Sequence, residues 1–595
     1  MKTDFVIFEN GEYNLKFIYP VLVEAEISRI RVELRDAFEK KTGVIPPLWA
    51  EDKIDADAEV REVLFGKTNR PESAAPAGVV EESDSYYTIA VIGNKLVISG
   101  SDIYQLRAAV RYFAKTYLSG DVVEQLAVPA DLSVVKIFKD YTRIHWRLCG
   151  VPAYPIGVNK LVPNEYECGT IITDCIPGKR NKSDVSLQRI DRTTEAEFAS
   201  YLAKLEQFGF EKEYENNTAE NLFMTYKNES MRVHVSFKPA IGEAQVISDP
   251  KGISVEEFGY SYTPRAGERS EYYLYGLPMT DGKGNGNPNC GTLSLIKCAD
   301  NSVIIIDGGE YEGWGGPQMC GDEVMGAFDA FLHQITKTPD GEKVRISGWY
   351  ITHYHSDHTR GMLEFFRKYN ANYEMERIIA NIPIQDCGGS AGRFSVEMTN
   401  WSFRLLEEWN ALLKTAYPNC KELKVHAGQK IQIADVSLEV LYTHEDLLTP
   451  MGFFNSSDSN DTSTVIRFDN GQMSMMVLGD GGQRTESRMR RVYTEATLKS
   501  DIVQPAHHLI YAVFAIYNAI KPTYALVPQS FECAQSKETL EGQGSYKERY
   551  DKVISFVGEN CYFAGNETVG LAVIDGKLQE CYHVKGVVGR RVGQG

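Results

Sequence analysis

The stretch Tyr350–Gly361, YITHYHSDHTRG, restricts the possible folds of this chain more than any other. It gathers three of the 11 histidines and an aspartate directly behind an apolar run. Side chains of an extended segment alternate between its two faces, so His353 and His355 are expected to point to the same side. Asp357 and His358 follow where the strand gives way to a loop, which lets them aim at a second point. Two adjacent points of convergence predict two metal ions.

The surrounding sequence predicts an α+β protein of three domains, in line with a length of 595 residues. Residues 1–139 mix helical and strand patterns, and residues 140–284 open in loop-rich sequence before a helix and three strand-like runs. In residues 285–595, apolar strands alternate with helices, which is typical of two packed sheets flanked by helices. The Gly- and Asn-rich stretch 281–291 is expected to be a loop or linker. His234 has no ligand-type neighbour in the sequence, so a structural or surface role is expected for it.

The charge, apolar runs and cysteines of the chain argue against several classes of protein. A net charge of -18 argues against a protein that coats nucleic acid or a membrane surface, because such surfaces attract basic stripes. No run approaches 18 apolar residues, so no membrane-spanning segment is expected. The chain start has acidic residues and no secretory pattern. The 11 cysteines are scattered without a CxxC pair, which favours reduced thiols and a cytoplasmic location.

At this point the sequence resembles a known family. THYHSDH is similar to the signature of metallo-β-lactamase-fold hydrolases, and the resemblance extends over residues 289–583. SVIIIDGG, MMVLGDGG and DIVQPAHH resemble later landmarks of that family. The resemblance implies an αββα sandwich in which Asp307 orients the metal-binding loop and Asp480 bridges two metals. The last ligand would be His507 or His508.

The resemblance also implies a role for each candidate residue. One metal would be held by His353, His355 and Asp480. The other would be held by Asp357, His358, Asp480 and His507, which is favoured because the order Pro-Ala-His resembles the Pro-Gly-His of other members. His508 would then contact the substrate as an oxyanion stabiliser or proton donor, and Asp357 would also accept or pass on a proton. Mixed nitrogen and oxygen ligands suit two zinc ions, with iron or manganese as alternatives.

One family landmark is missing. Many members carry a further histidine ligand in a Gly-His-Thr turn, whereas this chain reads NSSDSNDTSTVIRF at the corresponding place. That Asn-rich turn resembles the branch with the hydrolase domain of competence proteins and related phosphodiesterases. In that branch the histidine pair usually continues with glycine, but here it reads HHLI, so the local geometry and the substrate stay open. His444 lies nearby and could supply a ligand, although a supporting or surface role is favoured.

These features together predict a hydrolase in which a metal-bridging hydroxide attacks a phosphodiester or another small phosphorylated or ester substrate. Lactone or thioester hydrolysis at the same site is an alternative. A second alternative is a non-catalytic carbohydrate-binding protein with a structural metal, because residues 1–139 resemble the accessory domain that precedes many glycoside hydrolase barrels. The pocket is expected to be bordered by the loops GGEYEGWGGPQMCG and FNSSDSNDTS and by EYYLYG. The expected partner is a small molecule, an extended nucleic acid is disfavoured, and the oligomeric state is left open.

Overall fold

The computed structural model describes the chain with gaps, and two compact units are distinguished within it. The described residues are 4–20, 25–74, 85–101, 103–138, 150–152, 154, 166–167, 185–190, 193–278, 291–311, 318–382, 396–447, 459–510, 513–537 and 544–586. One unit comprises Met1–Glu165, Gln188–Lys204 and Thr449–Gly452. The other comprises Tyr166–Leu187, Leu205–Leu448 and Phe453–Gly595. The predicted linker, apart from Gly291, lies outside the described residues.

The first unit contains a six-stranded mixed sheet, a three-stranded sheet in the order β2-β1-β8, the helices α1 and α2, and most of helix α4 (Glu195–Gln207). The six-stranded sheet runs in the order β4-β3-β5-β7-β6-β9, and β6 and β7 form a hairpin that turns at Gly93 and Asn94. Helix α2 buries Leu106, Ala109, Val110 and Phe113, a spacing that places all four on one face. The elements are β1 (Phe5–Glu9), β2 (Glu12–Tyr13), β3 (Lys16–Tyr19), α1 (Ala25–Thr42), β4 (Leu48–Ala50), β5 (Glu62–Phe65), β6 (Ser85–Ile92), β7 (Lys95–Gly100), α2 (Ile103–Tyr117), β8 (Gln125–Val128) and β9 (Ser133–Phe138).

Four strands of a six-stranded sheet follow, paired antiparallel in the order β15-β14-β13-β12. Strand β14 puts Val233, Val235 and Phe237 on one face and His234, Ser236 and Lys238 on the other, and all six side chains are buried. A buried polar face needs polar partners from another part of the chain. The elements are β10 (Tyr166–Glu167), β11 (Ser186–Ile190), α4 (Glu195–Gln207), β12 (Glu211–Glu215), β13 (Leu222–Lys227), β14 (Arg232–Lys238), β15 (Glu243–Asp249) and α5 (Val255–Phe258).

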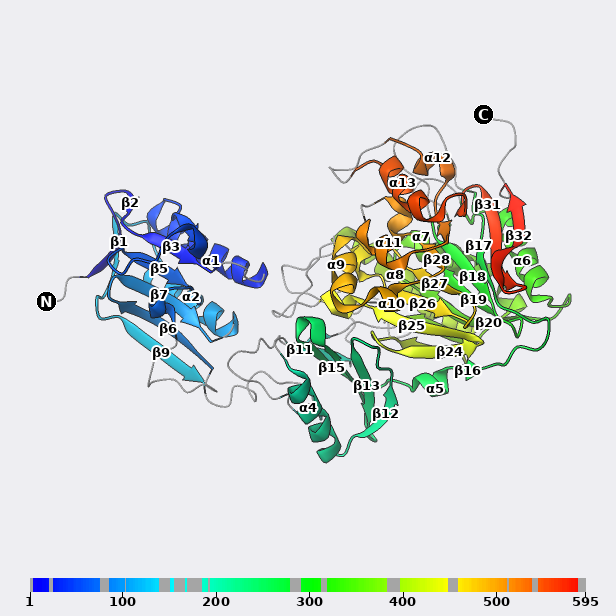
Figure 1. The fold of residues 1–595 in the computed structure, drawn as a ribbon, viewed down its shortest axis with the longest axis horizontal. Helices are drawn as coiled ribbons and strands as arrows, with labels where there is room; N and C mark the ends of the chain where they lie inside the picture. Colours follow the sequence, from blue (N-terminus) through cyan, green and yellow to red (C-terminus); the bar gives the residue numbers. More distant parts are fainter. Residues whose placement is uncertain are drawn as a thin grey trace. The chain divides into compact units, whose positions relative to one another are not determined.

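Two large sheets make up the rest of the second unit (Figure 1). One has the order β23-β22-β20-β19-β18-β17-β31-β32, with β21 paired to β20, and joins the green strands of the figure to the red C-terminal ones. Its strands are β17 (Glu271–Leu274), β18 (Leu293–Lys297), β19 (Val303–Asp307), β20 (Val344–Ile351), β21 (Tyr373–Met375), β22 (Arg377–Ala380), β23 (Lys421–Lys424), β31 (Glu567–Ile574) and β32 (Lys577–Lys585). Helices α6 (Asp322–Thr336), α7 (Ser356–Tyr369) and α8 (Val396–Ala416) accompany it.

The other sheet has the order β16-β24-β25-β26-β27-β28-β29-β30. Its strands are β16 (Tyr260–Ser261), β24 (Lys430–Ala434), β25 (Val436–Tyr442), β26 (Val465–Asp469), β27 (Ser474–Val477), β28 (Ile502–Gln504), β29 (Tyr524–Val527) and β30 (Cys561–Phe563). Its helices are α9 (Gln483–Val492), α10 (Glu495–Leu498), α11 (Ala515–Ile520), α12 (Phe531–Ala534) and α13 (Tyr546–Val557). Apolar side chains of both sheets share one buried cluster, and the helices α9, α11 and α13 share a second with this sheet.

The described elements therefore mix helices and sheets, as the sequence predicted, whereas the division into three domains at residues 139 and 284 stays a prediction. Two pairs of parallel strands position the site. β19 lies beside β20 in one sheet, and β27 lies beside β28 in the other. The chain leaves all four strands at their carboxyl ends close to the predicted metal-binding residues. Among the described residues, no helix has the length and apolar character needed to cross a membrane.

Candidate metal centre

The predicted histidine segment connects β20 to α7. β20 ends at Ile351, and His353 and His355 follow in the short connection before α7 begins at Ser356. Asp357 and His358 were expected in a loop, but they lie in the first turn of α7. The helical turn still separates them from His353 and His355, because adjacent helical residues project in different directions. The three histidine rings of the segment are buried.

Asp307 fixes the orientation of this segment. It ends β19 with a left-handed backbone, φ 58°. Its carboxylate accepts hydrogen bonds from the Thr352 amide at 2.8 Å and from the Thr352 hydroxyl, and lies 2.7 Å from Nδ1 of His358. A carboxylate on Nδ1 is the usual support of a metal-binding histidine, because it directs Nε2 towards the ion.

The first group of ligand-type atoms consists of His353, His355 and Asp480, within 4.8 Å of one another. Nε2 of His353 lies 3.8 Å from Oδ2 of Asp480, and the rings of His353 and His355 are 4.6 Å apart. Nε2 of His353 is buried and makes no hydrogen bond. A buried ring nitrogen without a partner is costly, so the group fits a metal ion.

The second group consists of Asp357, His358, Asp480 and His508. Nε2 of His358 lies 3.2 Å from Oδ1 of Asp480, and Nε2 of His508 lies 3.2 Å from Oδ2 of Asp357. The two ring nitrogens are 3.3 Å apart. Asp480 belongs to both groups, with one carboxylate oxygen towards each, which is the arrangement of a carboxylate between two ions.

The structure places His507 and His508 differently from the sequence prediction, which put His507 with Asp357 and His358. His508 occupies that position, and Nε2 of His507 instead lies 3.6 Å from Oδ2 of Asp480, the oxygen nearest His353. Both residues and Leu509 have left-handed backbones, with φ of 46°, 48° and 64°. No glycine relieves this turn, and such conformations are costly for other residues. With these backbone conformations, the ring of His508 and not that of His507 lies beside Asp357 and His358.

Ser463 is a supporting residue that the sequence did not reveal. Its hydroxyl accepts a hydrogen bond from the Asp480 amide at 2.9 Å and lies 3.3 Å from Nδ1 of His353. Nδ2 of Asn460 lies 3.4 Å from Nε2 of His507. Both residues belong to the Asn-rich turn that stands where the family has its Gly-His-Thr ligand, so that turn was the available signal. His444 is buried and belongs to neither group.

Of the predicted pocket loops, residues 312–317 and 454–458 lie outside the described residues. The stretch EYYLYG is described. Its Tyr272, Tyr273 and Tyr275 are buried in the apolar cluster shared by the two sheets, so the structure assigns them to the core.

Without metal, the centre balances its charges internally. Burial disfavours charge on His358, but the nearby carboxylates, Asp480 first, raise its pKa to about 10. Burial likewise opposes the charged carboxylate of Asp480, yet His358 and His508 hold its pKa well below the ordinary value. Burial and neighbouring histidines keep the pKa of His353 well below 6.5, and burial lowers that of His507 to about 4. A metal binding here would therefore displace protons from His358 and His508.

Comparisons with known proteins give little beyond this geometry. No protein-family description and no curated protein matches the sequence. Among solved structures, CmlA, a diiron β-hydroxylase from Streptomyces venezuelae, matches at 12% identity and a TM-score of 0.23 over 44% of this chain and 44% of CmlA. A protein of unknown function from Enterococcus faecalis matches at 11% and 0.23, over 40% of this chain and 49% of that one. The short form of human tRNase Z matches at 9% and 0.20, over 43% and 90%. Likenesses of this size carry no argument about this chain.

Proposed function

We propose that this chain is a hydrolase of the metallo-β-lactamase fold that uses two divalent metal ions, with zinc as the first candidate. The observation that carries the proposal is the position of Asp480 between two groups of buried histidines and carboxylates. A purely structural site would be closed around one ion, whereas paired ions that share a carboxylate are characteristic of hydrolytic centres.

The proposed ligands follow the two groups: His353, His355 and Asp480 for one ion, and Asp357, His358, Asp480 and His508 for the other. Bound there, the ions would supply an acidified water and neutralise negative charge on the substrate. Neutral His353 has a ring nitrogen free for a ligand. Asp307 holds the His358 ring in place. His507, with its low pKa, is neutral near pH 7 and is proposed to accept a hydrogen bond or proton beside the first group.

The preferred substrate is a small phosphodiester. The acidic chain disfavours a long polyanion, and the Asn-rich turn that contains Asn460 and Ser463 is the feature shared with the phosphodiesterase branch. Lactone or thioester hydrolysis at the same centre is retained as the alternative, because a paired metal centre can activate water towards phosphorus or carbon. A cytoplasmic location and a small-molecule partner remain part of the proposal.

The test measures turnover of a chromogenic phosphodiester, a lactone and a thioester by the zinc-loaded protein, beside Asp480→Ala. Asp469→Asn, in β26 and ion-paired to Arg467, is the control variant. We expect phosphodiester turnover that falls at least ~100-fold in Asp480→Ala and is kept in Asp469→Asn. Turnover of the lactone or thioester without turnover of the phosphodiester would show that the substrate is a carbonyl ester and not a phosphodiester. A wild-type protein that binds no metal at the centre would overturn the proposal as a whole.

A further inference from the structure

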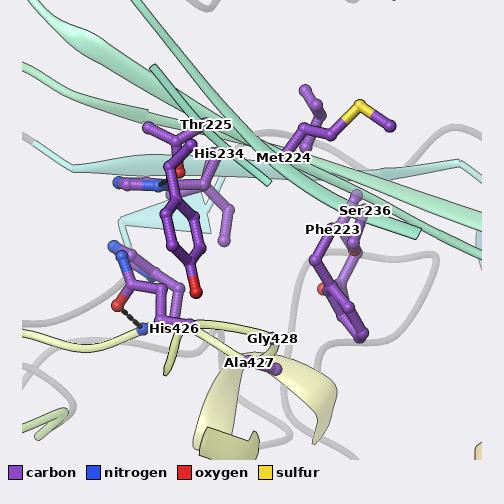
Figure 2. Close-up of a pocket in the computed structure, with 13 residues that line it drawn as sticks. Phe223, Met224, Thr225, His234, Ser236, His426, Ala427 and Gly428 are labelled. Carbon is purple, nitrogen blue, oxygen red and sulfur yellow. Dashed lines mark hydrogen bonds between the residues drawn. The ribbon is translucent and has the colours of Figure 1, made fainter. Parts of the chain in front are cut away.

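A second cluster of ligand-type residues lies away from the Asp480 centre. It consists of His234 in β14, Asp249 at the end of β15 and His426 between β23 and β24. All three side chains are buried, and their ligand-type atoms lie within 4.8 Å of one another. Figure 2 shows His234 on the strand side of a small pocket and His426 on the segment opposite. The sequence had assigned His234 no ligand-type neighbour. The buried position of His234 fits the structural role that was one of the two expected for it, and its ligand-type neighbours come from other parts of the chain.

Each of the two imidazole rings contacts a neighbouring side chain through Nδ1, which leaves its Nε2 for another partner. Nδ1 of His426 lies 3.0 Å from both carboxylate oxygens of Glu445, and Nδ1 of His234 lies 2.9 Å from the Thr225 hydroxyl. In each ring Nε2 therefore remains for a ligand. The carboxylate behind His426 repeats the Asp307–His358 pair of the first centre, where it directs the opposite nitrogen.

Nε2 of His426 is buried and makes no hydrogen bond. It lies 3.9 Å from Oδ2 of Asp249, too far for a hydrogen bond but suited to two ligands of one ion. The rings of His234 and His426 are 4.4 Å apart, close to the 4.6 Å between His353 and His355.

The alternative is an ion pair without metal, with a protonated His426 between Asp249 and Glu445. That arrangement accounts for the contact with Glu445. It also fits a 3.9 Å ion pair with Asp249, but it leaves Nε2 of His426 without a hydrogen bond and places a charged ring beside a second imidazole. A cation between the three side chains would give Nε2 of His426 a partner and pair the second carboxylate.

The surroundings of the two rings are closely packed around a small cavity. A cavity of about 20 Å³ borders both rings, enough for one water as a fourth ligand. The segment after His426 packs tightly on β13, since a Cβ on Gly428 would lie 2.0 Å from the Phe223 ring. Nδ2 of Asn216 also donates to the Gly428 carbonyl at 2.8 Å. This close packing keeps the ligands in place.

We propose that His234, Asp249 and His426 bind one zinc-type divalent cation, a structural site that ties the β12–β15 sheet to the segment between β23 and β24. Two imidazoles, one carboxylate and one water form a four-coordinate set that suits zinc. The site is separate from the proposed reaction, because it shares no residue with the Asp480 centre.

The experiment disables the Asp480 centre and measures how much metal the protein still binds. The full-length His358→Ala/Asp480→Ala protein, which keeps only two of the proposed ligands in each group of the first centre, is purified without added metal, loaded with zinc, desalted and measured by elemental analysis. We expect a single bound equivalent, which is lost when Asp249→Asn or His426→Gln is added and kept when His333→Gln is added as control. The double variant should melt at a lower temperature after chelation, whereas its Asp249→Asn derivative should not respond to the chelator.

Asp249→Asn preserves the size of the side chain, and circular dichroism checks that each variant is folded. As a second readout, anomalous scattering at the zinc edge should place the ion between His234 and His426. No metal in the folded double variant, or an equivalent that survives both Asp249→Asn and His426→Gln, would overturn the proposal. Either result would leave the proposed hydrolase function standing, because that function depends on the other centre.

Discussion

The two histidine clusters use the same components in different ways. In each, a buried carboxylate holds Nδ1 of a histidine, through Asp307 on His358 and through Glu445 on His426. The Asp480 centre sits at strand ends and includes left-handed residues at positions 307, 507 and 508. In the other cluster, His234 and Asp249 lie on regular strands, and none of the clustered residues has a positive φ. The energetically costly left-handed backbone conformations therefore occur at the centre where chemistry is proposed, and the cluster with a proposed structural role has none.

The largest expected effect separates the two adjacent histidines of the first centre. His508→Ala removes a proposed ligand of the second ion, so we expect loss of one metal equivalent and a fall in turnover of at least ~100-fold. His507→Ala should keep the metal of the second group and reduce turnover less. Elemental analysis and steady-state kinetics on both variants check this order. Equal metal loss in both would remove the distinction drawn from their ring directions.

A matched pair of substitutions compares the orienting carboxylates. Asp307→Asn and Glu445→Gln each weaken the support of a ligand histidine, and such changes cost roughly 10–100-fold in metal affinity. We expect each substitution to lower metal affinity at its own centre and not at the other. Competition with a chelator measures each affinity in proteins that keep only one of the two centres. A change that weakened both centres together would contradict their separation.

The second cluster also predicts a pH dependence for the metal-free protein. Burial opposes charge on His426, but Glu445 and Asp249 raise its pKa from 6.5 to about 9. Burial also opposes the Glu445 carboxylate, but His426 keeps its pKa below the ordinary 4.5. The histidine contribution is complete below pH 6.5 and is lost as pH rises through about 9, whereas the carboxylate contribution is present above pH 4.5 and is lost on acidification.

We therefore expect the melting temperature of the chelated wild type to exceed that of chelated His426→Gln most between pH 4.5 and 6.5. The difference should shrink towards pH 9. Melting curves across that range test the sign. A difference that grew with pH would show that the pair is not charged as described.

The smallest expected effect concerns a single hydroxyl. Thr225→Val removes the hydrogen bond to Nδ1 of His234 and should reduce the free energy of unfolding by about 1 kcal/mol. Metal content at the Asp480 centre should not change. Denaturant unfolding measures the first quantity and elemental analysis the second.

The extent to which these sites could be predicted depends on how their residues are spaced. His353, His355, Asp357 and His358 lie within six residues, so strand alternation and the expected loop after it indicated convergence, although the structure replaces that loop with the first turn of α7. Asp480 ends an apolar run and was found through the order of landmarks. The exchange of His507 and His508 depends on consecutive left-handed residues, which no sequence pattern announces in the absence of glycine.

The second cluster could not be predicted in this way, because His234, Asp249, His426 and Glu445 come from four separate elements or connections. The fold shows the same division. The mix of helices and sheets and the hairpin at Gly93 follow from local patterns. Which face of β14 would be covered, and by what, depends on the tertiary arrangement.

The buried polar face of β14 has a consequence for how the protein is synthesised. Lys238 is ion-paired to Asp446 at 2.5 Å, a partner 208 positions further along the chain. The His234 ring likewise contacts the ring of a later residue, His426. When the β12–β15 segment leaves the ribosome, these partners have not yet been made. Until residues 426–446 emerge, Lys238 lacks the Asp446 carboxylate and has only Gln245 and Glu243 of its own sheet as partners, while His234 has only Thr225. The final docking of this sheet must be a late event of folding, and a ribosome stalled before that point would hold a segment exposed to chaperones and proteases.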